Sequence, residues 1–147
     1  IFPPMPGQEG PVILVFGAHW CVPCHAAMGA LQARRTELDA AGVRLLYIHV
    51  DDVDRGQERT RDEIRALVMA DAARPELQDT RVLLGGDGGE LRLWHPEADV
   101  GALPGVSFIA ADGAVLDQCL GYDAADFDSR LSGFLTALAA PAEEATD

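Results

Sequence analysis

The pattern of apolar positions begins with two runs that each predict a buried strand. Residues 12–16 (VILVF) and 43–50 (VRLLYIHV) are almost continuously apolar, as in strands buried on both faces. Residues 23–41, between these runs, are rich in alanine with apolar side chains at roughly helical spacing, and Gly42 stands where a helix ends. This order of strand, helix and strand predicts a βαβ unit.

The rest of the chain predicts further helices and a hairpin. Thr60 and Glu63 form a capping box that starts a helix, and Asp112-Gly113 supplies the tight turn of a β-hairpin. The elements expected after residue 50 are a helix over 60–72, a short strand at 81–84, a flexible glycine turn at 85–89, hairpin strands at 105–110 and 114–120, and a last helix capped by Asp123. The whole order, βαβα(β)ββα, predicts an α/β fold.

The length of 147 residues fits one domain with its own hydrophobic core. We expect an N-terminal extension over 1–10, a domain over 11–140 and a flexible acidic tail over 141–147. The net charge of -13 argues against nucleic acid or anionic lipid as a partner. No apolar run is long enough to cross a membrane. The start at Ile1 is consistent with a processed chain whose upstream part was a signal peptide or an anchor.

The stretch HWCVPCH, residues 19–25, directly follows the first predicted strand and carries the chemistry of the chain. Its C-x-x-C is a redox dithiol motif. A strand that passes into a helix here places Cys21 at the helix N-terminus, where unpaired N–H groups and the helix dipole favour a thiolate. Cys21 is therefore the expected nucleophile and Cys24 the resolving thiol, with Pro23 stiffening the loop between them.

The same motif also reads C-x-x-C-H, which is a haem attachment site. That alternative needs both thiols as thioethers, His25 as an axial ligand, and a distal ligand such as Met69 or His95. A copper or zinc site would use Cys21, Cys24 and a histidine, but a second close pair of ligands is missing. The buried strand and the βαβ unit around the motif favour the dithiol, so we expect no cofactor and no metal.

Three stretches together resemble the thioredoxin superfamily, and within it the bacterial TlpA/ResA-type proteins: residues 12–24 (VILVFGAHWCVPC), Leu103-Pro104 and residues 108–113 (FIAADG). The resemblance implies a thioredoxin-like fold, with a central mixed β-sheet flanked by helices, and thiol-disulfide exchange with protein substrates and an upstream redox partner. It makes Pro104 a cis-proline facing the dithiol, and the Leu103 backbone a pairing edge for an extended substrate. It also implies a reductant in the periplasm or on the outer face of the bacterial cytoplasmic membrane.

The chain departs from the family pattern where a proton acceptor is expected. Val15 stands where thioredoxins carry a buried Asp, and Ala27 stands where TlpA/ResA proteins carry a Glu. Gly29 replaces a helix proline of the family. The sequence therefore leaves open how Cys24 loses its proton.

Two histidines flank the dithiol and suggest a substitute for the missing carboxylates. One hypothesis is that His19 or His25 supplies positive charge that lowers the pKa of Cys21, which would make the disulfide more oxidising. The alternative is two solvated surface histidines. Trp20 is expected both to face the substrate and to cover the C-x-x-C turn.

The remaining polar candidates have simpler interpretations. Cys119, in a predicted strand, is expected to be a small buried hydrophobic residue. His49 lies inside an apolar strand and is expected to be a hydrogen-bonded core histidine. The acidic run of Asp51, Asp52 and Asp54 lacks the spacing of a calcium loop and is expected to be a solvated strand end.

Overall fold

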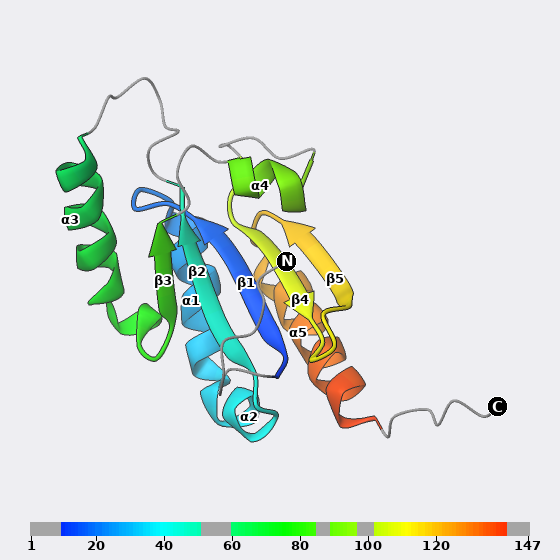
Figure 1. The fold of residues 1–147 in the computed structure, drawn as a ribbon. Coiled ribbons are helices and arrows are strands. Elements are labelled where there is room, and N and C mark those ends of the chain that lie inside the picture. The colour runs from blue at the N-terminus through cyan, green and yellow to red at the C-terminus, as the bar shows by residue number, and fades with distance from the viewer. Residues whose placement is uncertain (1–9, 51–59, 85–88, 97–101, 141–147) are drawn as a thin grey trace.

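The computed structural model describes residues 10–50, 60–84, 89–96 and 102–140 of the chain. In these parts, five strands form one sheet with helices around it (Figure 1). The strands are β1 (Val12–Gly17), β2 (Arg44–His49), β3 (Arg81–Leu84), β4 (Gly105–Ile109) and β5 (Val115–Leu120). The helices are α1 (Val22–Ala33), α2 (Arg35–Ala40), α3 (Arg61–Ala72), the 3-10 turn η2 (Pro75–Leu77), α4 (Gly89–Trp94) and α5 (Ala124–Ala139).

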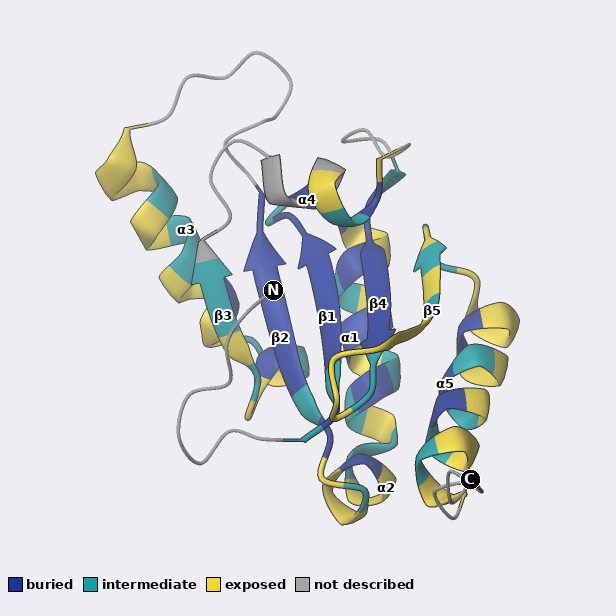
Figure 2. Ribbon diagram, turned by 45° about the vertical axis from the view of Figure 1, so that its right-hand side comes forward, coloured by how far each residue is buried: buried dark blue, intermediate teal, exposed yellow. Residues whose placement is uncertain are grey.

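The sheet has the strand order β3-β2-β1-β4-β5, with β1 in the centre. β1 and β2 pair in parallel, as do β2 and β3, whereas β4 is antiparallel to both of its neighbours, so the sheet is mixed. The strands β1, β2 and β4 are buried along most of their length, whereas β5 is largely exposed (Figure 2). This burial explains why continuous apolar runs mark β1 and β2 in the sequence.

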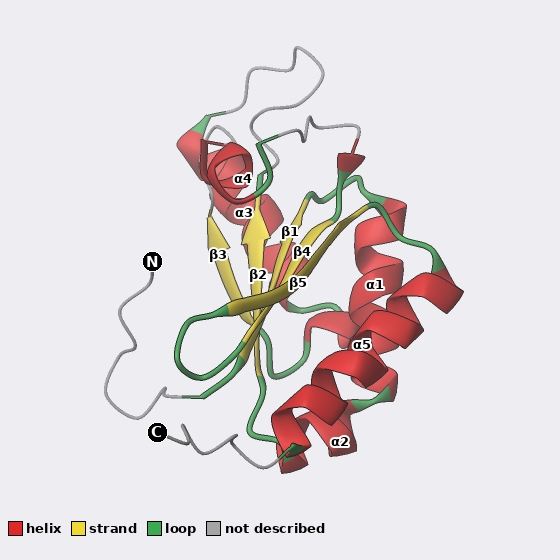
Figure 3. Ribbon diagram, turned by 90° about the vertical axis from the view of Figure 1, so that its right-hand side faces the viewer, coloured by secondary structure: helices red, strands yellow, loops and turns green. Residues whose placement is uncertain are grey.

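Helices cover both faces of the sheet. α1, α2 and α5 lie on one side and α4 on the other, with α3 beside the edge strand β3 (Figures 1 and 3). On the α5 side, the ring of Phe108 contacts those of Phe127 and Phe134, with centroids 6.1 and 5.4 Å apart. Met28 and Leu31 of α1 are fully buried against the same core. The architecture confirms the predicted α/β fold with a central mixed sheet flanked by helices.

The single helix predicted over residues 23–41 is wrong, because the chain leaves the helical conformation at Arg34 (φ -112°, ψ 24°) and divides it into α1 and α2. The Arg34 guanidinium is held from α5: Nη1 donates to Ser132 Oγ at 2.7 Å and to Asp128 Oδ1 at 3.2 Å. These partners lie far along the chain. Arg34 also donates to both carboxylate oxygens of Glu37, at 3.0 and 2.9 Å, so local and tertiary contacts together hold the side chain at the break.

The glycine turn predicted at 85–89 also needs correction, because Gly89 begins α4, a helix that the sequence analysis did not predict. Residues 85–88 lie outside the described residues, as do most of the N-terminal extension, the acidic run at 51–54 and the tail over 141–147. None of the helices in the described part of the chain has the length and apolar character that crossing a bilayer requires.

Candidate active site

Cys21 and Cys24 lie where the central strand passes into α1, and a disulfide joins them, with Cα atoms 5.2 Å apart. Cys21 is the N-cap residue of α1: its backbone is extended (φ -85°, ψ 98°), and its sulfur accepts a hydrogen bond from the Cys24 amide at 3.2 Å. The Cys21 amide donates to the Ala18 carbonyl at 3.1 Å, so the connection turns tightly. The helix N-terminus thus lies at Cys21 Sγ, a position that favours a thiolate once the disulfide is reduced.

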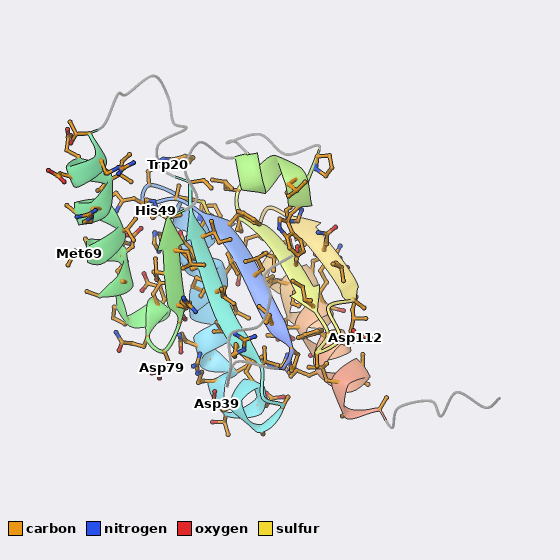
Figure 4. The ribbon with its side chains drawn as sticks, in the orientation of Figure 1. Trp20, Asp39, His49, Met69, Asp79 and Asp112 are labelled. Atoms are coloured by element: carbon orange, nitrogen blue, oxygen red, sulfur yellow. A yellow bond between two sulfur atoms is a disulfide. The ribbon has the colours of Figure 1, made fainter. Side chains whose placement is uncertain are left out.

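Apolar side chains surround the disulfide. Cys21 is 3% exposed and Cys24 is fully buried, but Val22 between them is 77% exposed. Pro23, in the first turn of α1, is exposed as well. Trp20 is half-buried and packs against the core, at the end of the sheet where β1 and β2 finish (Figure 4). A partner that reaches the sulfurs therefore meets an apolar rim.

The Leu103–Pro104 peptide is cis, as the sequence predicts. β4 begins at the next residue, Gly105, which pairs with Phe16 on β1, so Pro104 lies next to the connection that carries the disulfide. The Pro104 carbonyl accepts a hydrogen bond from the Gly121 amide at 2.8 Å. Within the described residues, the Leu103 main chain makes no backbone hydrogen bond, and Leu103 is 5% exposed.

A buried carboxylate lies behind the C-x-x-C turn. Asp71, in the last turn of α3, is fully buried, with Oδ1 3.0 Å from His19 Nδ1 and Oδ2 3.0 Å from His49 Nε2. Arg74 Nε lies 3.2 Å from Asp71 Oδ1. An ionised carboxylate only accepts hydrogen bonds, so both imidazoles donate to it. His49 is thus the buried, hydrogen-bonded core histidine that the sequence predicts, although its partner was not foreseen.

Two opposing effects set the pKa of Asp71. Burial raises the pKa of the carboxyl group, but the hydrogen bonds and charges of His49 and His19 outweigh burial and bring the pKa below its ordinary value. Asp71 is therefore ionised at neutral pH. Val15 and Ala27, where related proteins carry a carboxylate, are fully buried and apolar here. The site does contain a buried carboxylate, but it comes from α3 rather than from either of those positions.

His25, in the first turn of α1, is held by contacts with three other residues. Its ring stacks on Tyr47 with centroids 6.2 Å apart, and Nε2 donates to the His19 carbonyl at 3.2 Å. Nδ1 lies 3.3 Å from Glu76 Oε1, within ion-pair range although without the alignment of a hydrogen bond. Both ring nitrogens face protein oxygens, which disfavours the axial-ligand role that a haem site requires.

One short segment provides the acidic partners of both histidines. Arg74 contacts both of these acids: its Nε lies 3.2 Å from Asp71 Oδ1 and its Nη1 lies 3.6 Å from Glu76 Oε1. The histidine side chains are 34% exposed at His19 and 12% exposed at His25, so neither is a fully solvated surface residue. The dithiol is therefore flanked by two imidazoles whose positions are set by residues between the end of α3 and η2.

The sequence analysis missed Asp71, Arg74 and Glu76. A signal for Asp71 exists: Ile64 and Val68 mark the apolar face of the predicted helix, and Asp71 continues that face three residues later. A charged residue on an inward-facing position indicates a buried partner. Arg74 and Glu76 follow the helix and have no such periodicity, so only the folded structure identifies them.

The other candidate side chains lie apart from the disulfide. Met69 is 66% exposed and points away from the sheet (Figure 4). His95, on the α4 side, packs edge-on against Phe16, and its Nε2 lies 3.4 Å from Ser107 Oγ. Burial lowers the pKa of the His95 imidazole. At Cys119, burial is the main effect that raises the pKa to about 11. Among the described residues, no group of three or more His, Cys, Asp or Glu could hold a metal ion.

Comparison with known proteins identifies the family. The AhpC/TSA family matches residues 6–117, which is most of the chain. No curated protein matches it.

Several solved structures share the fold. A protein assigned as thiol:disulfide interchange protein DsbE from Chlorobium tepidum is 20% identical, with 88% of this chain and 81% of that chain covered and a TM-score of 0.65. The pneumococcal exposed lipoprotein thioredoxin from Streptococcus pneumoniae is 18% identical over 86% and 84% (TM-score 0.61). A secreted disulfide oxidoreductase from Mycobacterium tuberculosis, homologous to E. coli DsbE, is 22% identical over 87% and 81% (TM-score 0.53).

The family match, the mixed sheet, the cis-proline and the disulfide-bonded C-x-x-C are consistent with one another. The chain belongs to the AhpC/TSA family and is a thioredoxin-like thiol-disulfide oxidoreductase with a disulfide-bonded C-x-x-C.

Proposed function

We propose that this oxidoreductase reduces disulfides of other proteins in the bacterial cell envelope, with Cys21 as the nucleophile and Cys24 as the resolving thiol. The main support is the N-cap position of Cys21: its sulfur accepts a hydrogen bond from the Cys24 amide and lies at the positive end of α1, which favours a thiolate. The Cys21 thiolate attacks a substrate disulfide, forms a mixed disulfide and releases one substrate thiolate. Cys24 then attacks Cys21 Sγ, releases the second substrate thiolate and forms the Cys21–Cys24 disulfide.

Substrate recognition would use the apolar rim and the main chain beside it. Trp20, Val22 and Pro23 offer apolar contact area around the disulfide. The Leu103 backbone, next to Pro104, would pair with an extended segment of the substrate, which gives affinity with little dependence on substrate side chains. This mode of binding suits a protein that accepts several partners.

The reducing direction and the location rest on resemblance. TlpA/ResA-type proteins are typically reductants outside the cytoplasmic membrane, and two of the structures with this fold are described as a secreted oxidoreductase and as an exposed lipoprotein thioredoxin. A reductant of this kind needs an upstream redox partner that returns electrons to the disulfide. The net charge of -13 favours a basic or neutral docking patch on that partner.

An oxidising direction is the second candidate, and the flanking histidines favour it. His19 and His25 flank the dithiol, each within 3.3 Å of a carboxylate oxygen, and positive charge beside a thiolate would stabilise the reduced form of the protein. A more stable reduced form makes the disulfide a stronger oxidant. A redox titration against glutathione or dithiothreitol, followed by Trp20 fluorescence, distinguishes the two directions. A potential near about -270 mV supports the reductant, and a value near about -120 mV overturns it in favour of the oxidant.

A trapping experiment tests the assignment of the two thiols. The Cys24→Ser variant, reduced and mixed with insulin, is expected to accumulate a mixed disulfide through Cys21, because the resolving step is blocked. The Cys21→Ser variant should trap nothing, and Cys119→Ser should behave as the wild type because its thiol is not part of the site. Trapping through Cys24 in the Cys21→Ser variant would overturn the assignment.

A further inference from the structure

We propose that Asp71 is a positioning residue of the dithiol site, which holds His19 as the base that accepts the Cys21 proton before disulfide exchange. The inference rests on the proposed role of Cys21 and extends it to α3, an element outside the C-x-x-C motif. The observation that supports it is the 3.0 Å contact between Asp71 Oδ1 and His19 Nδ1. His19 lies two residues before Cys21 in the sequence. It concerns the proton of the Cys21 thiol, not that of Cys24.

The hydrogen bond fixes which ring nitrogen acts. Asp71 accepts only, so His19 donates from Nδ1, and its acceptor lone pair then belongs to Nε2. A carboxylate in this relation to an imidazole sets its tautomer and ring orientation, and stabilises the imidazolium that forms when the ring gains a proton. Asp71 itself keeps its negative charge throughout.

The anchoring of Asp71 makes it a rigid support. Its second oxygen accepts from His49 Nε2 at 3.0 Å, and Arg74 Nε lies 3.2 Å from the first, so the carboxylate cannot rotate without losing these contacts. His49 is fully buried, and its Nδ1 has no hydrogen-bond partner within the described residues. His49 therefore serves as a second anchor for Asp71, while His19, at 34% exposure, reaches from the buried carboxylate to the surface of the site.

The proton step is balanced within the site. The S–H bond of Cys21 breaks and an N–H bond forms at His19 Nε2, directly or through one water, so a neutral pair becomes a thiolate–imidazolium pair of the same total charge. The hydrogen bond from the Cys21 amide to the Ala18 carbonyl closes a tight turn, which holds His19 and Cys21, two residues apart, in one short connection. The thiolate then attacks the substrate, and the imidazolium returns its proton to the thiolate that leaves.

The other charged and titratable groups around His19 provide a matched control. Among the described residues they include Asp71 from α3, Arg74 after it, Glu76 from η2, His25 from α1, and His49 and Tyr47 from β2. Glu76 faces the other histidine without hydrogen-bond alignment, and the Nε2 of His25 is engaged by the His19 carbonyl. Glu76→Gln therefore removes a nearby carboxylate charge and leaves both partners of the Asp71–His19 contact in place, although it frees one contact of the Arg74 guanidinium.

The test measures the pH dependence of iodoacetamide alkylation at Cys21 in the reduced full chain, resolved by peptide mass. Asp71→Asn should raise the pH midpoint by about one unit, which lowers the alkylation rate at pH 6 about tenfold. His19→Gln should give the same shift, and the double variant should give no further shift. Glu76→Gln should stay close to the wild type. An unchanged midpoint in Asp71→Asn, or a second shift in the double variant, would overturn the proposal.

Because Asp71→Asn affects a buried cluster, two measurements keep the test independent of its folding. Circular dichroism establishes whether each variant is folded, and His19→Gln alters only a partly exposed side chain. In the wild type, nitrogen NMR of labelled histidines should report His19 protonated at Nδ1 at neutral pH, whereas a neutral ring protonated only at Nε2 would contradict the proposal. Alkylation needs no protein substrate, so failure of insulin reduction with an intact Asp71 effect would contradict the proposed function alone.

Discussion

The side-chain amide of Gln32 donates a hydrogen bond of 2.7 Å to the carbonyl oxygen of Gln78, and a second one of 3.2 Å to the carbonyl of Glu76. Gln32 belongs to α1, which begins at the disulfide, and its acceptors belong to the segment that carries the acidic partner of His25. The contact therefore fastens that segment to the helix of the dithiol.

Replacing Gln32 by Ala is expected to lower the free energy of unfolding by about 1 kcal/mol, because two backbone carbonyls lose a donor. Urea denaturation measures the change. Gln78→Ala is the control, since the acceptor at that residue is a main-chain atom that the substitution leaves in place; it removes only the exposed 3.4 Å contact of the Gln78 amide with the Arg74 carbonyl. Equal losses in the two variants would contradict the assigned role of the Gln32 amide.

Gly17→Ala is expected to destabilise the fold by about 1–3 kcal/mol, because a Cβ at this position would overlap the Tyr47 hydroxyl. Tyr47 cannot move freely, since its ring stacks on His25 and its hydroxyl donates to the Ala18 carbonyl at 3.3 Å. Adding Tyr47→Leu should recover part of the loss, because it removes the hydroxyl and the ring carbons that the Cβ would overlap. Denaturation of the two single variants and the double variant measures this coupling, and strict additivity would argue against the overlap.

Gly29→Ala makes the same chemical change at an open position. Gly29 lies inside α1, is exposed, and a Cβ there would meet no atom within 4 Å. Alanine has the higher helix propensity, so the variant should be more stable by about 0.5–1 kcal/mol in the same denaturation assay. Gly133 in α5 offers a second site of the same kind, and a loss of stability at both would show that the space around these helices is occupied.

The stability of the protein should decrease in mild acid partly through His95. Burial lowers the pKa of this imidazole, so the unfolded chain, whose histidines titrate near about pH 6.5, binds its proton first. His95 therefore contributes stability above that pH, and this contribution is lost as the pH falls from there towards the folded-state pKa. Urea denaturation at a series of pH values should show a smaller decrease in His95→Gln than in the wild type; identical slopes would exclude the effect.

Cys119 should be almost inert towards alkylation in the folded protein. Burial is the first cause that raises the pKa of this thiol to about 11, which leaves very little thiolate at pH 8. In the Cys21→Ser/Cys24→Ser variant, where Cys119 is the remaining cysteine, iodoacetamide labelling at pH 8 should become faster by on the order of a hundredfold when urea unfolds the chain. Labelling at equal rates in both states would show that the thiol is accessible.

Much of the fold could be predicted because its signals are local. The apolar runs of β1 and β2 are buried on both faces, the capping box of Thr60 and Glu63 forms in both directions, and Gly113 adopts φ 92° in the hairpin turn. The break at Arg34 could not be predicted in this way. Two of the side chains that hold Arg34 there, Ser132 and Asp128, reach it only when α5 packs beside α1.

In the candidate site too, residues with a local sequence signal could be predicted, and residues that depend on tertiary contacts could not. The C-x-x-C motif and the cis-proline are short patterns with a fixed relation to the chain, so residues 21, 24 and 104 could be identified before the structure was known. The buried carboxylate could not be located by comparing Val15 and Ala27 with family positions, because the charge at Asp71 comes from a different helix. Contacts across 52 positions in sequence depend on tertiary packing alone.

The bridge that Arg74 makes between Asp71 and Glu76 has a consequence for engineering and for divergence. The carboxylates that face the two histidines of the C-x-x-C stretch come from residues 71–76 and not from the motif itself. This segment can therefore change while the motif stays the same. Point changes at the two acids should show epistasis, because each alters the partner available to the shared guanidinium. Homologues with an identical C-x-x-C motif are therefore expected to differ in the carboxylates that face the two histidines when this segment differs.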